Sequence, residues 1–309
     1  MKYAKKLLAA ALVLVLVFSL TGCTEFESRM VKAANKMKKV NNLRADVVFY
    51  LDLDVKMLGQ SLSEMEMSAE GTLDIDTVHS TGFGRFHVVS VDEEQDVLLY
   101  FEKSGDVMRT WTSDDDGMTW KLSEATADEA GAASGFTDFG SITDLNKEQI
   151  AQLRAVAATF EEDGVTEIRG SESTIYRGTV SVKDLPEEVD LTEALGQLTE
   201  STGIQVTPED IQNIGDMPVA IAIDNNTGLI SGFALDMTDL MQGVVSIAMD
   251  AYMAQLLGEE LEGLDLSMLG VTMVVNDCEL ECVLYDYDQV GDVVIPDDVR
   301  ENAVLADAA

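Results

Sequence analysis

Residues 43–76 have the sequence LRADVVFYLDLDVKMLGQSLSEMEMSAEGTLDID, and this stretch decides the fold. All odd positions of residues 47–57 are apolar, and in residues 65–75 most odd positions are apolar while most even positions carry Glu or Asp. An alternation with a period of two is typical of a strand that buries one face and leaves the other in water. Because Gly59-Gln60-Ser61 separates the two runs with turn residues, the sequence predicts an antiparallel hairpin.

The sequence outward from this hairpin predicts further strands. Strand-like segments at 83–91, 96–103 and 107–112 are separated by turn residues and predict a meander. Asn225-Asn226-Thr227-Gly228 is a strong hairpin signal between two later runs. Those runs and the remaining expected strands are 217–224, 229–237, 167–170, 173–183, 271–287 and a closing edge segment at 293–299. The chain is therefore expected to be rich in antiparallel sheet.

Helical periodicity is confined to a few segments. Residues 26–40 have the apolar stripe of an amphipathic helix that packs on the body of the protein. The residues of this stripe are Phe26, Met30, Ala33, Ala34 and Met37. Residues 238–258 predict an unusually apolar helix, of the kind that is buried on most sides. Shorter helices are expected at 149–163, at 186–199 and from Thr207 onward.

The N-terminal sequence MKYAKKLLAAALVLVLVFSLTGC has the three parts of an export signal. Three lysines precede an apolar run of 14 residues at 7–20, which is shorter than the about 20 residues that span a bilayer as a helix. Leu20-Thr21-Gly22-Cys23 resembles the lipobox of bacterial lipoproteins, in which the cysteine sulfur is acylated; an ordinary secretory signal would favour an A-x-A-like end. We therefore expect residues 1–22 to be a lipoprotein signal peptide, Cys23 to be the lipidated residue, and residues 23–42 to be a lipid-anchored N-terminal helix segment.

The charge of the chain is strongly acidic and unevenly distributed. There are 57 acidic and 20 basic residues, a formal net charge of −37. Nucleic acid is excluded as a partner, because phosphate binding needs a basic surface. The basic residues that lie near the expected anchor are Arg29, Lys32, Lys36, Lys38, Lys39 and Arg44. Such a segment would be drawn to anionic headgroups while the acidic body stands off the membrane; the alternative is that the lysines are only the solvated side of the first helix.

No enzyme template fits the sequence. The motifs G-x-S-x-G, H-E-x-x-H and G-x-x-x-x-G-K are absent, and the two histidines, His79 and His87, would lie roughly 26 Å apart on one strand. We therefore expect no catalytic residue, no cofactor and no metal site. Cys278 and Cys282 alternate with acidic residues along a predicted strand and are interpreted as small core residues, with a redox or metal role as the alternative.

Residues 113–120 have the sequence SDDDGMTW, which fits S-x-D-x-G-x-T-W and resembles an Asp-box, the hairpin motif of sialidase-type propellers. Ser113 and Asp115 can satisfy turn amides, and Gly117 supplies a positive φ. Trp120 is expected to pack under the hairpin. Because a propeller needs several boxes and this chain has one, the motif is interpreted as turn chemistry; glycan processing is a third functional hypothesis that would need further boxes.

The order of these parts resembles a known family. The parts are the lipobox, the N-terminal helix, the strand at 43–57, the returning strand at 64–76, the region from Tyr100 through Trp111 to Lys121, the hairpin at 219–228, and the terminal Tyr285 and Val294-Ile295-Pro296. In this layout the chain is similar to the LolA-like superfamily of lipoprotein carriers. It is especially similar to the LppX- and LprG-type lipoproteins of Gram-positive bacteria and mycobacteria, including a family of uncharacterised Firmicutes lipoproteins. The resemblance implies an α+β fold, an antiparallel β half-barrel curved around α-helices, with residues 43–309 as a single domain and an apolar cavity that takes the acyl chains of a lipid or glycolipid.

These observations lead to one main functional hypothesis. The chain is expected to be a non-enzymatic lipoprotein, anchored on the outer face of the cell membrane, that binds a hydrophobic or amphiphilic ligand between sheet and helix. The expected ligand-cavity residues are Phe49, Leu51, Leu53, Met65 and Met67 on the strands and Met241, Val245 and Tyr252 on the helix at 238–258. A simpler interpretation of this helix is that it fills the core.

The alternative hypothesis is a structural or sensory lipoprotein. It would bind a protein partner or a cell-wall polymer through residues 123–146. This segment is rich in Ala, Gly, Ser, Thr and Asp and is expected to form a loop or lid.

Overall fold

The computed structural model describes residues 25–91, 93–105, 107–126, 159–181, 214–257 and 271–305. Within these ranges the chain forms one open sheet of 12 strands, in the order β12-β6-β5-β4-β3-β2-β1-β11-β10-β9-β8-β7. Neighbouring strands are antiparallel, apart from the parallel pair β12 and β6. The strands are β1 (Asn42–Met57), β2 (Gln60–Asp76), β3 (Thr81–Val89), β4 (Glu94–Ser104), β5 (Val107–Ser113), β6 (Lys121–Thr126), β7 (Glu161–Ile168), β8 (Ser171–Val180), β9 (Met217–Asp224), β10 (Ile230–Asp236), β11 (Val271–Tyr285) and β12 (Val304–Leu305). The predicted antiparallel, sheet-rich fold is confirmed.

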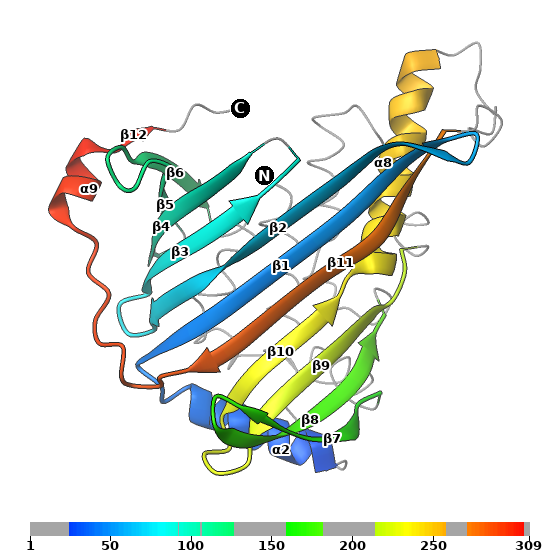
Figure 1. Ribbon diagram of the computed structural model, residues 1–309. Coiled ribbons are helices and arrows are strands. Elements are labelled where there is room, and N and C mark those ends of the chain that lie inside the picture. The colour runs from blue at the N-terminus through cyan, green and yellow to red at the C-terminus, as the bar shows by residue number, and fades with distance from the viewer. Residues whose placement is uncertain are drawn as a thin grey trace.

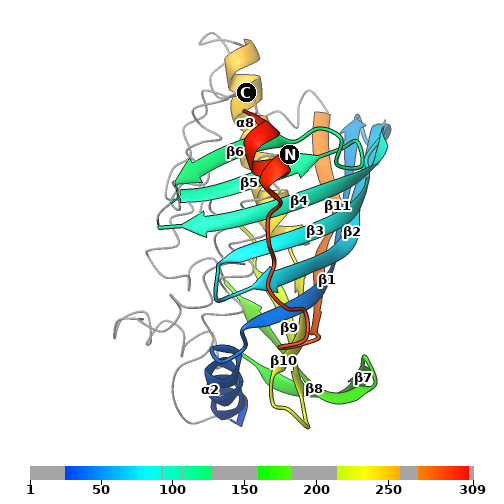
Figure 2. The same cartoon turned by 90° about the vertical axis from the view of Figure 1, so that its left-hand side faces the viewer.

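The sheet is curved, and two helices lie on its concave side (Figures 1 and 2). Helix α2 (Glu25–Met37) packs on β9 and β10, and helix α8 (Thr238–Leu257) packs along β11. A short helix, α9 (Asp297–Asn302), lies near β5 and β6 at the other edge (Figure 1). Among the helices of the described ranges, none has the length and apolarity that crossing a bilayer requires.

The hairpin predicted from the opening stretch is present as β1 and β2. The register places Leu51 opposite Met67, so apolar side chains meet across the two strands. The connection is a two-residue turn at Leu58 and Gly59, where the sequence analysis expected residues 59–61. Both turn residues have a positive φ, 53° and 79°, as the mirror-image turns of two-residue hairpins require.

Helix α2 buries the predicted apolar stripe against the sheet. Its buried residues are Phe26, Glu27, Met30, Ala33, Ala34 and Met37. The apolar members join one large core cluster with inner residues of β1, β2 and β8 to β11. Burial of such a stripe is the main source of stability for a helix of this length, so α2 is part of the folded body.

The cysteines of β11 are core residues, as predicted. Cys278 and Cys282 are both free and buried in the large core cluster. Burial raises the pKa of the Cys278 thiol to about 12 and also raises the pKa of Cys282. Because the thiolate is the reactive form of cysteine, these side chains act as small apolar groups.

Two glycines let aromatic rings lie close to the backbone of β2 and β3. Gly71 lies opposite Phe86, and a Cβ atom at residue 71 would be 2.1 Å from the Arg85 carbonyl oxygen. Gly82 lies opposite Phe101, whose ring carbon Cε1 would be 2.1 Å from such a Cβ atom. A side chain does not fit at either position unless a neighbour moves, so close packing requires glycine here.

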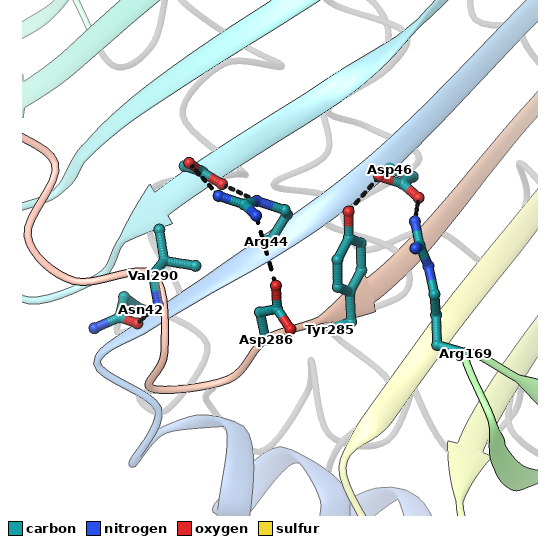
Figure 3. A network of polar contacts seen from close by, with 8 residues as sticks. Asn42, Arg44, Asp46, Arg169, Tyr285, Asp286 and Val290 are labelled. Atoms are coloured by element: carbon teal, nitrogen blue, oxygen red, sulfur yellow. Dashed lines mark hydrogen bonds and ion pairs between the residues drawn. The ribbon is translucent and has the colours of Figure 1, made fainter.

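Polar contacts on the face of β1 that points away from the core connect four segments of the chain (Figure 3). The Arg44 guanidinium donates two hydrogen bonds to Asp74 on β2, at 2.5 and 2.9 Å. The Asp46 carboxylate accepts hydrogen bonds from the Tyr285 hydroxyl, at 2.6 Å, and from Arg169 in the turn between β7 and β8. These contacts join β1 to β2, to β11 and to the far edge of the sheet.

The predicted helix at 149–163 is wrong for its last residues. Residues 161–163 begin β7, an edge strand in which Glu161 lies opposite Arg177 of β8. Almost all side chains of β7 are exposed. Because neither face of this strand is buried, its sequence does not alternate between apolar and polar residues. Pairing with β8 therefore decides its conformation. Residues 149–158 lie outside the described ranges.

Two segments near the other edge also differ from the prediction. Residues 123–126, expected as part of a loop, belong to β6 and pair with β5. Residues 297–299, expected in an edge strand, begin α9, because Asp297 and Asp298 follow Pro296 as favourable residues of a first helical turn. The edge strand of this region is the later β12.

Several predictions lie outside the described residues and stay predictions. They concern the signal peptide at 1–22, Cys23, the loop at 127–146, the helices at 186–199 and from 207, and the last residue of the helix at 238–258.

Candidate ligand-binding face

The five strand residues predicted to line a cavity lie together on the inner face of β1 and β2. Leu51 is buried, with 8% of its surface exposed, whereas Phe49, Leu53, Met65 and Met67 are half-buried. The register places Leu51 opposite Met67 and, two residues along, Leu53 opposite Met65. Directly opposed side chains on one face of an antiparallel pair are in contact range. We call these five residues the inner strip.

Two of the three predicted helix residues lie against the same core. Met241 and Val245 are one helical turn apart, and both are half-buried. They pack on the large core cluster, and so do all residues of the inner strip except Met65. The side chain of Tyr252 lies outside the described part of the chain. The structure therefore brings the first two turns of α8 and most of the inner strip to one apolar region.

Helix α8 is attached to β11 by side-chain hydrogen bonds to the strand backbone. β10 pairs with β11 only over residues 279–283, so among the described strands none covers the earlier part of this edge. There, Thr238 Oγ1 accepts a hydrogen bond from Cys278 N at 3.0 Å. Gln242 Oε1 accepts a hydrogen bond from Val275 N at 2.9 Å, and Gln242 Nε2 donates a hydrogen bond to the Met273 carbonyl oxygen at 3.2 Å. Because buried backbone groups need partners, α8 takes the place of a strand at this end of the sheet.

The sequence analysis missed these two attachment residues. Thr238 and Gln242 are polar positions four residues apart at the start of a mostly apolar helix. Residues with this spacing share one helical face, and this is the signal that would have identified them.

The other end of the inner face is closed by α2. The ring of Phe26 stacks on Phe160 with centroids 4.5 Å apart, and it lies 5.0 Å from the ring of Tyr176. The Tyr176 hydroxyl is buried and has no hydrogen-bond partner among the described residues, and burial raises the pKa of Tyr176. An unpaired buried hydroxyl costs free energy, so this oxygen is a place where a polar atom of a ligand or a water would be stabilised. No pattern in the sequence singled out Tyr176.

The Asp-box-like segment forms a self-contained turn between β5 and β6. The Asp115 carboxylate accepts hydrogen bonds from Ser113 Oγ at 2.7 Å, from Thr119 N at 2.8 Å and from Thr119 Oγ1 at 2.6 Å. Gly117, with a φ of 83°, donates from its N–H to Ser113 Oγ, and Trp120 Nε1 donates to the Gly117 carbonyl oxygen. The polar groups of the motif satisfy one another, which confirms the interpretation as turn chemistry.

The turn makes the carboxyl group of Asp115 unusually acidic. Hydrogen bonds from Thr119 and Ser113 lower the pKa of Asp115 to about 2. Since the ordinary value is about 3.9, the ionised carboxylate stabilises the turn above that pH, and this contribution is lost as the pH falls toward 2. A carboxyl-carbon NMR titration is expected to show the low value and to show it rising in Thr119→Val. Thr119→Ser keeps the hydroxyl and serves as the control; an unchanged pKa in Thr119→Val would contradict the role of Thr119.

Comparisons with known proteins give similarity only at the level of solved structures. No protein-family model matches the sequence, and no curated protein matches it. The chain is similar to the lipoprotein LppX of Mycobacterium tuberculosis, with 10% identity, a TM-score of 0.38, and coverage of 86% of this chain and 97% of LppX. It is also similar to LprF from Mycobacterium bovis, with 11% identity, a TM-score of 0.35, and coverage of 88% and 96%. A β-barrel-like protein of unknown function from Brucella abortus has 8% identity, a TM-score of 0.23, and coverage of 80% and 97%.

Proposed function

We propose that this chain is a non-enzymatic lipoprotein on the outer face of the cell membrane that binds the acyl chains of a lipid or another amphiphile. The observation that carries the proposal is the inner strip: four of its five apolar residues are only half-buried although they lie on the concave side of the sheet. Apolar surface that a ligand covers contributes about 25 cal/mol per Å². A hydrocarbon chain laid along this strip would therefore be bound favourably.

The proposal includes a half-barrel arrangement in which the ligand lies between the curved sheet and α8. Helix α8 lies on the concave side (Figure 2), and Met241 and Val245 face the core that the inner strip joins. Thr238 and Gln242 fasten the start of this helix to β11.

Anchoring through an acylated Cys23 is proposed from the N-terminal sequence. Helix α2 begins two residues after this cysteine and packs on the sheet through its apolar stripe. Lys32, Lys38 and Lys39 are exposed in and just after α2. Basic residues beside a lipid anchor add about 1 kcal/mol each near an anionic membrane surface, so these lysines would hold this end of the domain toward the headgroups.

Binding of a protein partner or a cell-wall polymer is the other function expected from the sequence. It depends mainly on residues 127–146, which lie outside the described residues. None of the contacts described above favours it.

Native mass spectrometry of the full chain purified from membranes, followed by organic extraction, tests the proposal. The wild-type protein is expected to carry about one amphiphile per chain. Leu53→Glu places a charge in the inner strip and is expected to lower the bound amount roughly tenfold or more, because a buried charge without a partner is strongly disfavoured.

The matched control is Val48→Glu, which adds the same charge at an exposed position of β1. This variant is expected to keep its ligand. Both variants are compared at equal folded fraction, measured by circular dichroism. A wild-type protein that is always empty, or an equal loss of ligand in the two variants, would contradict the proposal.

A further inference from the structure

Three metal-ligating side chains from two distant parts of the chain converge at one end of β2. They are Asp76 at the end of β2, His79 in the turn before β3, and Asp292 in residues 286–296, which we call the C-terminal strap. One ligand atom of each lies within 4.8 Å of the others. We propose that Asp76, His79 and Asp292 form a binding site for a divalent transition-metal ion of the Zn²⁺ type.

Asp76 is held in place by the turn that follows it. Its side chain is buried, with 2% of the residue exposed, and Oδ1 accepts hydrogen bonds from the N–H groups of Val78 and His79, each at 3.0 Å. Its second oxygen, Oδ2, lies 2.6 Å from His79 Nδ1. Oδ2 faces the imidazole and also accepts a long hydrogen bond from Val293 N, at 3.4 Å, so it lies between His79 and the segment that carries Asp292.

The C-terminal strap brings the third ligand to this pair. The Thr81 hydroxyl donates a hydrogen bond to the Val293 carbonyl oxygen at 2.7 Å, and Val290 N donates to Asn42 Oδ1 at 2.9 Å. Asp292 is the residue just before Val293, and its carboxylate makes no hydrogen bond or ion pair with any residue of the described ranges. The strap is therefore fixed on both sides of Asp292, whose charge acts on the neighbouring His79 imidazole.

The donor set favours zinc-type chemistry. A carboxylate oxygen and an imidazole nitrogen bind Zn²⁺ at about 2.0–2.2 Å, so two ligands of one tetrahedral ion lie roughly 3.3 Å apart. Asp76 Oδ2 and His79 Nδ1 are 2.6 Å apart in a hydrogen bond, so the imidazole must turn away from Oδ2 for both atoms to bind the ion. His79 is exposed over 58% of its side chain, and its ring and the exposed Asp292 side chain can rotate to close the remaining distance. Ca²⁺ would require about six to eight oxygen ligands, which this site does not supply.

Electrostatics also favour a cation here. Without an ion, two carboxylates share the site with one imidazole, in a chain whose formal net charge is −37. A divalent cation would balance the two carboxylates, and three protein ligands leave a position for water. The alternative is a plain hydrogen bond between His79 and Asp76 beside an unrelated Asp292.

A bound ion would fasten the C-terminal strap. The end of the strap leads into α9, where Arg300 donates two hydrogen bonds to Glu102 on β4, at 2.7 and 2.8 Å, and lies 5.5 Å from the centroid of Trp111. The ion would hold the strap to β2 at one point, and Arg300 holds it to β4 at another. Metal binding is therefore expected to stabilise the attachment of α9 to the sheet.

Isothermal titration of the full, chelator-treated chain with ZnCl₂ tests the site. Physiological salt and excess Mg²⁺ are present, because they saturate weak sites on the acidic surface. One Zn²⁺ per chain is expected to bind to the wild-type protein. Asp292→Asn and His79→Gln are each expected to weaken this binding at least roughly tenfold, and Zn²⁺ is expected to raise the thermal midpoint of the wild type but not of either variant.

The matched control is His87→Gln. His87 is also flanked by acids, with Asp96 at 2.9 Å and Glu94 at 3.5 Å, but it is not part of the converging group. This variant is expected to bind Zn²⁺ as the wild type does. Absence of stoichiometric binding in the wild type, or equal binding in the wild type, Asp292→Asn and His79→Gln, would overturn the proposal.

Discussion

Replacing Phe26 with alanine is expected to lower the free energy of unfolding by about 3–5 kcal/mol, the usual cost of truncating a buried phenylalanine. Phe26 is exposed over only 2% of its surface. Its ring packs on Phe160 and Tyr176, so the truncation leaves a void where α2 meets β8 and the segment before β7. Equilibrium unfolding in urea, followed by circular dichroism, measures the loss.

The control for this prediction is Ser28→Ala on the exposed side of the same helix. It is expected to change the free energy of unfolding by less than about 0.5 kcal/mol. If Phe26→Ala were as mild as Ser28→Ala, the docking of α2 on the sheet would be contradicted.

Gly71→Val is expected to destabilise the protein by about 3 kcal/mol or more, at the upper end of the cost of overpacking. A Cβ atom at this position would be 2.1 Å from the Arg85 carbonyl oxygen and 2.7 Å from Phe86 Cδ1. The first of these atoms belongs to the backbone of β3, so relief requires the two strands to separate. The midpoint and slope of urea unfolding are the measurements.

Thr72→Val is the matched control for Gly71→Val. It places the same β-branched side chain one residue along β2, on the exposed face. Valine suits an exposed strand position, so the midpoint is expected to stay within error of the wild type. Equal midpoints for both variants would show that β2 and β3 do not approach each other as described.

The parts of the fold that sequence predicted are those in which an element buries one face. The alternation in residues 47–57 and 65–75 predicted β1 and β2, and the apolar stripe of residues 26–40 predicted the buried side of α2. The turn at 225–228 placed β9 and β10 on either side. In each case the local pattern and the tertiary environment agree, which is the condition for reliable prediction.

The wrong assignments concern segments without such agreement. β7 exposes side chains on both faces, so its strand conformation depends on hydrogen bonds to β8 and not on its own sequence pattern. Residues 297–299 were expected in the closing edge segment at 293–299, although Pro296 and two aspartates form a helix start. Tertiary pairing and short capping signals outweigh periodicity in pieces of this length.

The candidate sites were predictable only in part. The inner strip follows from alternation, and its cross-strand pairs follow from the hairpin register. The link between Gln242 and Val275, and the approach of Asp292 to Asp76, join residues from different elements. No local pattern contains this information, because it depends on which elements the folded chain places side by side.

The strand order has a consequence for how the chain reaches its folded state. β1 lies in the middle of the sheet, yet one of its two neighbours is β11, so residues 42–57 gain that neighbour only when residues 271–285 are available. Pairing between such distant segments is slow, and an unpaired strand edge can recruit strands from other molecules. During synthesis this edge of β1 stays open while nearly all of the polypeptide is made. A product truncated before residue 271 would have two additional free edges, on β1 and β10, and would be prone to aggregation.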